Sequence, residues 1–274
     1  MWFVDNVSMR IVDAFRVLNL LPTKLVSLTM RFLKASFFAL VALLSTPILS
    51  QFEHIPLTDP TTGIVFQSWK PSEHVTFGLA LPRDALSVDA GEFIGYLSCT
   101  SSKWCGISLG GGMLSSLLLL AYPSGSQVLT SFRWATDYTL PVVYTGDAKL
   151  TQISSKVNST AEDDYEIIFR CKNCLKWVQK GEEGTAGAVS TREGFLVLGW
   201  VRGLQEVGYE GERKCADEVL VGQHEKQGIF GAELDGGVVK EGKWEEWVGL
   251  DEGREVKGDC GEIKICRKRY EGRD

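Results

Sequence analysis

The sequence predicts an all-β protein in which short antiparallel strands form a sandwich or a barrel. Between residues 51 and 200, β-prone runs alternate with turn residues at intervals of about 8–15 residues. No stretch of this region keeps the 3.6-residue hydrophobic period of an amphipathic helix. Hydrophobic residues make up 44% of the 274-residue chain and charged residues 23%, which is ordinary globular composition and excludes disorder of the whole chain.

The expected strands are placed by their apolar runs and by the residues that end them. Pro82 ends the run 75–81, and Pro123-Ser124-Gly125 supplies a hairpin turn after 117–122. The run 91–98 alternates apolar and polar residues. Tryptophan and phenylalanine side chains can fill the space of about 10 Å between two packed sheets. In chain order, the expected strands are 63–69, 75–81, 91–98, 104–109, 117–122, 127–134, 149–153, 165–170 and 194–200.

Charge is distributed unevenly along the chain and divides it into three parts. The net charge is −6, so the basic surface typical of a nucleic-acid-binding protein is not expected. Residues 51–200 carry few charges and can bury a core, whereas residues 201–274 are rich in charge and glycine. We therefore expect a separate N-terminal segment at 1–50, a folded domain at 51–234, and a polar, charged tail at 235–274 that is prone to disorder.

The N-terminal segment has the pattern of a secretory signal behind an extension of 29 residues. A basic start at 30–34, the apolar run Phe37–Leu44 and a small residue before Gln51 are the parts of such a signal, placed at about 30–50. The apolar run is short for a membrane span, which needs about 20 residues. We therefore expect a cleaved signal and a secreted protein. The alternative is a membrane-anchoring N-terminus.

Two further features agree with secretion. The chain has seven cysteines, and an oxidising compartment would let them pair. The six-residue separation of Cys99 and Cys105 permits a disulfide, while Cys215, Cys260 and Cys266 have no partner that the sequence identifies. Asn158-Ser159-Thr160 is an N-glycosylation acceptor triplet.

Few residues qualify for a metal or catalytic site. The run Gly110-Gly111-Gly112 lacks the spacing of a dinucleotide-binding loop, but it lets the backbone approach a large flat group beside Met113. A single methionine is more often a core residue than a ligand. His224 is followed by a Gly-x-Phe-Gly pattern that we interpret as a compact turn. With three histidines and one CxxC pair, a zinc site lacks its second ligand pair, and a Ser-His-Asp triad lacks the Gly-x-Ser-x-Gly motif.

A long series of stretches in a fixed order carries a resemblance to a known family. The stretches are Phe93-Ile-Gly95, Ser102-Lys-Trp104, Gly106 to Met113, Leu117 to Ala121, Ser131 to Tyr138, Tyr144-Thr-Gly146, Asn158-Ser-Thr160 and Phe169 to Cys174. Together they resemble the haem b cytochrome domain of cellobiose dehydrogenase and its stand-alone relatives, which are secreted fungal proteins. The resemblance extends from Thr58 to Gly231, about 175 residues.

The resemblance implies an immunoglobulin-like sandwich of two antiparallel sheets that binds one haem b. The axial methionine of the family falls on Met113, beside the cofactor-facing Gly112. The axial histidine falls on His224, and a tyrosine that hydrogen-bonds a haem propionate falls on Tyr138. The short disulfide of the family falls on Cys171 and Cys174.

Two axial ligands leave haem iron no open position, so electron transfer is favoured over activation of oxygen or a substrate. The resemblance implies that single electrons arrive from a flavin-dependent sugar dehydrogenase and leave to a copper polysaccharide monooxygenase or ferric iron. We expect a stand-alone carrier without a substrate site of its own, because no dehydrogenase domain is recognised in the sequence. The alternatives are a haem-free binding module, for example for carbohydrate, and the product of a degraded gene.

Overall fold

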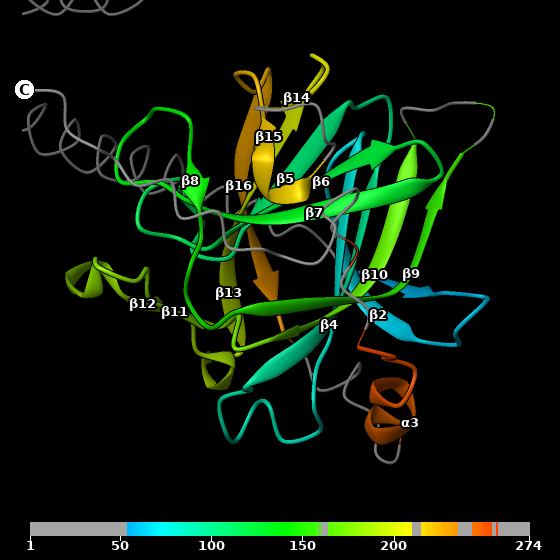
Figure 1. The fold of residues 1–274 in the computed structure, drawn as a ribbon. Helices are drawn as coiled ribbons and strands as arrows, with labels where there is room; N and C mark the ends of the chain where they lie inside the picture. The colour runs from blue at the N-terminus through cyan, green and yellow to red at the C-terminus, as the bar shows by residue number, and fades with distance from the viewer. Residues whose placement is uncertain are drawn as a thin grey trace, which may run out of the picture. The chain divides into compact units, whose positions relative to one another are not determined.

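Two antiparallel six-stranded sheets form the framework of the described part of the chain (Figure 1). The structure is a computed structural model and describes residues 54–158, 160, 164–209, 215–234, 243–253 and 256. The expected extension and signal at 1–50 lie outside the described residues. Within the described part of the chain, no helix has the length and apolar character needed to cross a membrane.

The first sheet has the strand order β1-β2-β3-β4-β10-β9 and the second has the order β16-β13-β5-β6-β7-β8. The first contains β1 (Ile55–Thr58), β2 (Val65–Ser72), β3 (Val75–Ala80), β4 (Glu92–Cys99), β9 (Lys149–Val157) and β10 (Tyr165–Lys172). The second contains β5 (Trp104–Ser108), β6 (Leu118–Ser124), β7 (Gln127–Trp134), β8 (Val142–Val143), β13 (Phe195–Gly203) and β16 (Lys226–Glu233).

Short elements connect and cover the two sheets. Two-stranded pairs are formed by β11 (Lys176–Trp177) with β12 (Gly187–Ala188), and by β14 (Gly208–Tyr209) with β15 (Val219–Leu220). Among the described residues, the helical elements are the 3₁₀ turns η2 (Glu183–Thr185), η3 (Thr191–Glu193) and η4 (Ala216–Glu218), and the α-helix α3 (Trp244–Val248).

This architecture confirms the predicted antiparallel β-sandwich, and each of the nine expected strands overlaps an observed one. One expectation was wrong: the Gly-x-Phe-Gly pattern after His224, which we interpreted as a compact turn, does not form one. Gly228 and Gly231 lie inside β16, which pairs with β13 over its full length. Glycine in a strand does not force a turn when a neighbouring strand supplies the hydrogen bonds and leaves no room for a side chain.

The main hydrophobic core lies between the sheets. It contains alternate residues of several strands, such as Val75, Phe77 and Leu79 of β3, all of which are buried. Buried hydrogen bonds join the two sheets across this core. Tyr165 Oη donates to the carbonyl of Ala121 at 2.9 Å, linking β10 to β6. Because such a bond needs both sheets in place, it fixes their relative position as well as their stability.

Two polar contacts and one disulfide complete the links between sheets. Gln67 Nε2 donates to the carbonyl of Glu233 at 2.6 Å, and Gln152 Nε2 donates to the carbonyl of Val128 at 2.8 Å. A disulfide joins Cys99 at the end of β4 to Cys105 in β5, which confirms that this spacing permits a bridge.

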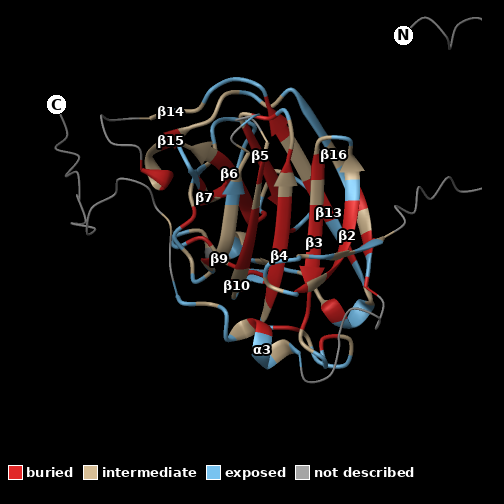
Figure 2. Cartoon of the chain, turned by 90° about the vertical axis from the view of Figure 1, so that its right-hand side faces the viewer, coloured by how far each residue is buried: buried red, intermediate tan, exposed pale blue. Residues whose placement is uncertain are grey.

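The segment 243–253 differs from the disordered tail that its charge predicts. Helix α3 packs on the outer face of the first sheet (Figure 2), where Trp247 is 3% exposed among residues that include Phe66 and Ile168. Arg170 donates to both carboxylate oxygens of Glu92 at 2.8 and 2.9 Å, and its third nitrogen lies 3.4 Å from Asp251. A tryptophan that directly follows two glutamates thus supplies an apolar contact that the charged composition of this segment does not indicate.

The carboxylate of Asp251 makes the docking of this segment dependent on pH. Burial alone would raise its pKa, but hydrogen bonds from the Gly253 N–H and from Arg170 hold the pKa below its ordinary value. Its contribution to stability is therefore present above the unfolded pKa of about 3.9 and is lost as the pH falls through the folded value.

We predict that Asp251→Asn lowers the free energy of unfolding by about 1 kcal/mol at neutral pH. The variant should also lose part of the decline in stability that the parent protein shows below about pH 4. Urea unfolding at several pH values measures both effects. Parallel pH profiles for parent and variant would show that Asp251 does not contribute in the way described.

Candidate functional site

One part of the outer surface of the second sheet carries exposed apolar side chains. Phe195 and Val197 of β13 are each 47% exposed, and Ile229 of β16 is 64% exposed. The register pairs Val197 with Gly231 and Ile229 with Gly199, so these residues share one face of the sheet. Large apolar side chains beside glycines form a flat strip of surface. We call Phe195, Val197, Gly199, Ile229 and Gly231 the apolar face.

The loop that joins β5 to β6, residues 109–117, lies against the apolar face and carries Met113. Gly111 has a φ of 82°, and a Cβ there would lie 2.9 Å from Cγ1 of Val197. A Cβ on Gly199 would lie 2.4 Å from the carbonyl oxygen of Gly111. Both glycines are therefore needed for the loop to contact the sheet. Met113, two residues further on, is partly exposed.

Hydrogen bonds hold this loop in place. Ser108 Oγ donates to the carbonyl of Gly112 at 2.5 Å. Ser116 is 2% exposed. Its Oγ accepts from the Gly110 N–H at 2.8 Å and lies 2.8 Å from Ser108 Oγ. Gly112 itself is exposed, and a Cβ there would meet nothing within 4 Å. The predicted contact of Gly112 with a cofactor thus stays a prediction.

His224 lies beyond the end of the apolar face that is formed by Gly199 and Ile229. Lys226 pairs with Arg202, and the N–H of Glu225 donates to the carbonyl of Arg202 at 2.9 Å, so His224 lies just beyond the end of this pairing. Gly111 contacts β13 at Gly199, whereas the register of β13 and β16 puts His224 at about the level of Leu204. At about 3.4 Å per residue, these two levels are about 17 Å apart along β13.

Tyr138 lies in the loop between β7 and β8, and its side chain is 82% exposed. This loop begins at Ala135, whose carbonyl accepts the Ser115 N–H at 2.9 Å. The structure therefore brings the Tyr138 and Met113 loops together, while His224 lies further along β13, beyond the Gly199 end of the apolar face. Sequence reasoning did not identify the apolar face, because Gly194–Trp200 is apolar on both sides of the strand.

The remaining predicted residues lie elsewhere. Cys171 and Cys174 form a disulfide, and Cys215 is also disulfide-bonded, with a partner outside the described residues. Asn158 follows β9, where its Oδ1 accepts from the Thr160 hydroxyl at 2.8 Å. Among the described residues, no three His, Cys, Asp or Glu side chains gather where they could hold a metal ion. A haem held by one methionine and one histidine does not need such a group.

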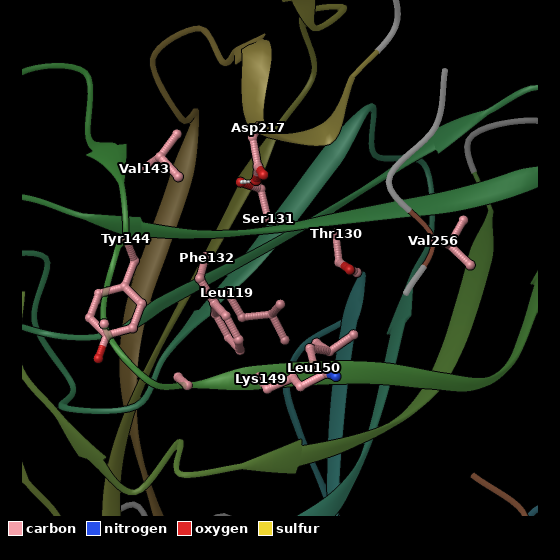
Figure 3. Close-up of a pocket in the computed structure, with 12 residues that line it drawn as sticks. Leu119, Thr130, Ser131, Phe132, Val143, Tyr144, Lys149, Leu150, Asp217 and Val256 are labelled. Carbon is pink, nitrogen blue, oxygen red and sulfur yellow. Dashed lines mark hydrogen bonds between the residues drawn. The ribbon is translucent and has the colours of Figure 1, made fainter. Parts of the chain in front are cut away.

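The structure also has concave regions away from the apolar face. A cavity of about 220 Å³ lies where β7 and β9 meet (Figure 3). Thr130 and Phe132 point toward β9, whereas Ser131 points to the other side of β7 and donates to Asp217 at 3.3 Å (Figure 3). A second hollow of about 500 Å³ is lined by Tyr144, Trp177 and neighbouring residues. Neither is lined by Met113 or His224.

Comparison with known families decides the assignment. The model of the cytochrome domain of cellobiose dehydrogenase matches residues 57–244. The chain belongs to this family. The match extends past residue 234, the expected end of the domain, to the first residue of α3. Cytochrome domains of this family bind haem and transfer electrons, so the predicted family, the sandwich and the cytochrome class of function are confirmed.

Solved structures and a curated relative agree with the family. The cytochrome domain of Myriococcum thermophilum cellobiose dehydrogenase is 42% identical, with a TM-score of 0.66, over 76% of this chain and 98% of that one. The cytochrome b domain of Coprinopsis cinerea pyranose dehydrogenase shares the fold at 24% identity, with a TM-score of 0.55, over 75% of this chain and 100% of that one.

The curated relative is the pyrroloquinoline quinone-dependent pyranose dehydrogenase of Coprinopsis cinerea. It is 35% identical over 144 residues, which are 52% of this chain and 19% of that protein. The match thus covers about a fifth of the relative, and the sugar chemistry of the whole relative is not shown for this chain.

We predict that Ser116→Ala lowers the free energy of unfolding by about 1–3 kcal/mol, because it leaves the Gly110 N–H without its acceptor. Ser87→Ala is the matched control, since the Ser87 hydroxyl donates to a carbonyl at an exposed site and its loss should cost less than about 0.5 kcal/mol. Equal losses in urea unfolding for both variants would show that Ser116 does not hold the loop.

Proposed function

We propose that this chain binds haem b at the apolar face, with Met113 and His224 as the two axial ligands of the iron. The observation that carries the proposal is that the Met113 loop contacts the outer side of β13 at Val197 and Gly199, within the exposed apolar face, while His224 lies about 17 Å further along β13. Bound haem would supply reversible one-electron oxidation and reduction.

The residues of this chain would control that chemistry. The thioether of Met113 is a weak donor that favours ferrous iron, so it would raise the reduction potential relative to a pair of histidines. Phe195, Val197 and Ile229 would keep water from one side of the ring. Tyr138 would donate its hydroxyl to a haem propionate, and Gly112 would let the loop backbone pass close to the ring edge. With both axial positions filled, the protein would transfer electrons and would not activate a substrate.

The proposed partners are a sugar dehydrogenase as electron donor and a copper polysaccharide monooxygenase or ferric iron as acceptor. The donor is supported by the names of the relatives, which are cellobiose and pyranose dehydrogenases. The flavin-dependent or quinone-dependent class of donor would dock near the loops of Met113 and Tyr138. Mixing the reduced protein with each acceptor, and following reoxidation by absorbance, tests this part directly.

We also propose that the protein is secreted and glycosylated at Asn158. Two disulfides link residues of the described domain, as is typical of proteins from oxidising compartments. Thr160 donates to the Asn158 side chain in an exposed turn, which leaves the triplet at the surface. A decrease in apparent mass on treatment of the secreted protein with an N-glycosidase, absent in Asn158→Gln, tests the assignment.

A haem-free carbohydrate-binding module is the second candidate. The aromatic rings of Tyr138 and Phe195 are exposed, at 82% and 47%, and exposed aromatic rings can stack on sugars. The two functions differ in a simple property. A haem protein is red, with an absorbance band that shifts when dithionite reduces the iron, whereas a sugar-binding module is colourless.

We predict that Met113→Ala binds haem but has a lower reduction potential and an open axial position that accepts carbon monoxide. We predict that His224→Ala loses most of its haem, because imidazole is the stronger of the two ligands. Absorbance spectra of both variants, oxidised and reduced, measure these effects. Spectra that match the parent protein in both variants would show that other residues hold the iron.

A further inference from the structure

Trp177 contacts the loop that carries Met113 from a separate part of the fold. It lies in β11, three residues after the disulfide between Cys171 and Cys174, and its residue exposure is 5%. Its indole Nε1 donates to the carbonyl of Ser115 at 3.1 Å. Ser115 is two residues from Met113, so this bond ends close to the proposed sulfur ligand.

Two glycines lie directly against the indole ring of Trp177. A Cβ on Gly187 would lie 2.5 Å from Nε1 of Trp177, and a Cβ on Gly110 would lie 3.1 Å from its Cζ2. Gly187 is the direct partner of Trp177 in the pairing of β11 with β12. The missing side chains leave room for the ring on both sides. The ring therefore contacts the Met113 loop through Gly110 as well as through its N–H.

Ser115 needs this support because its backbone is strained. Its φ is 52°, a left-handed conformation that residues other than glycine rarely adopt and that persists when neighbours hold it. Its N–H donates to the carbonyl of Ala135 at 2.9 Å, and its carbonyl accepts from Trp177. Both polar groups of this peptide segment are thus held by residues outside the loop.

The segment that carries Trp177, strand β11 with its partner β12, is held by contacts that do not involve the Met113 loop. The N–H of Val189 donates to the carbonyl of Leu175 at 2.9 Å, and the N–H of Val178 donates to Tyr144 Oη at 3.2 Å. The first bond holds the β11 and β12 segments together, and the second ties them to the second sheet, because the N–H of Tyr144 donates to the carbonyl of Phe132 in β7 at 2.9 Å. A fixed donor of this kind selects one conformation of a loop that would otherwise have several.

We propose that Trp177 is a positioning residue for the sixth ligand of the haem iron, through its hydrogen bond to Ser115 and its contact with Gly110. The inference rests on the proposed function, since it gives the loop conformation a role in ligation. Loss of the bond would let the Met113 loop move, so the thioether would occupy its axial position for a smaller fraction of the time.

The variant Trp177→Phe tests the proposal, because phenylalanine keeps an aromatic ring and removes the N–H donor. Trp69→Phe is the matched control, since Trp69 is a fully buried tryptophan of β2 and its Nε1 has no hydrogen-bond partner among the described residues. Gly187→Ala is a second variant that displaces the ring without changing Trp177, in case the first variant does not fold.

Hydrogen exchange of the haem-free proteins gives the first measurement. We expect exchange in residues 110–116 to be about fivefold faster in Trp177→Phe than in the parent, which corresponds to the loss of one net hydrogen bond. The control should exchange in this loop as the parent does. Unchanged exchange of the loop in both test variants would overturn the proposal without any reference to haem.

The haem-loaded proteins give the second measurement. We expect Trp177→Phe to keep its haem, lose intensity in the thioether-to-ferric-iron band, show a lower reduction potential and bind carbon monoxide, while Trp69→Phe matches the parent. Faster loop exchange together with a parental band, potential and carbon monoxide response would overturn the positioning role.

The variant Met113→Ala separates the two proposals. If its spectrum and potential equal those of the parent protein, the ligand assignment has failed, and with it the positioning of a ligand. If Met113→Ala changes them and Trp177→Phe does not, the proposed function stands and the inference about Trp177 is wrong.

Discussion

The pairing of β13 with two neighbours is the constraint on which the candidate site depends. β5 and β16 are both antiparallel to β13, so they run parallel to each other on either side of it. The loop that leaves β5 and the segment that enters β16 must then lie at opposite ends of the same sheet surface. Met113 belongs to the first and His224 to the second. Two residues more than a hundred positions apart in the chain thus face one strip of surface from both ends.

The apolar face is exposed, whereas described segments cover another part of the same side of the second sheet. Residues 207–209 and 215–221 pack over β6 and β7, where Arg133 donates to the carbonyls of Ala216, Asp217 and Val219. The same covering does not extend over Val197 and Ile229, which remain about half exposed or more. Apolar side chains exposed on adjacent strands are typical of a surface that binds something. In this family of cytochrome domains, the bound group is haem.

Much of the fold follows from local sequence patterns, because strands in a sandwich bury alternate residues and end at turn residues. The runs 91–98 and 127–134 are observed within one residue of their expected bounds. β16 was missed because its two glycines resemble a turn, and only its neighbour β13 explains why they are in a strand. Helix α3 was missed for a related reason, since Trp247 is buried by residues of the first sheet that are distant in sequence.

The candidate site was predictable in part. The family resemblance gives Met113 and His224 as the proposed ligands, while the glycine run alone shows only that the backbone beside Met113 can approach a large flat group. The apolar face was not predictable, because Phe195 to Leu198 are all apolar and do not show which two point outward. Ser116 and Trp177 hold the loop through hydrogen bonds to Gly110 and Ser115. No spacing in the sequence indicates these hydrogen bonds.

X-ray absorption at the iron edge of the haem-loaded protein tests the central claim most directly, because it reports the atoms bound to the metal. The account predicts one sulfur ligand beside the nitrogen ligands of the porphyrin and of one imidazole. A spectrum with nitrogen neighbours alone, or purified protein that contains no iron, would contradict it.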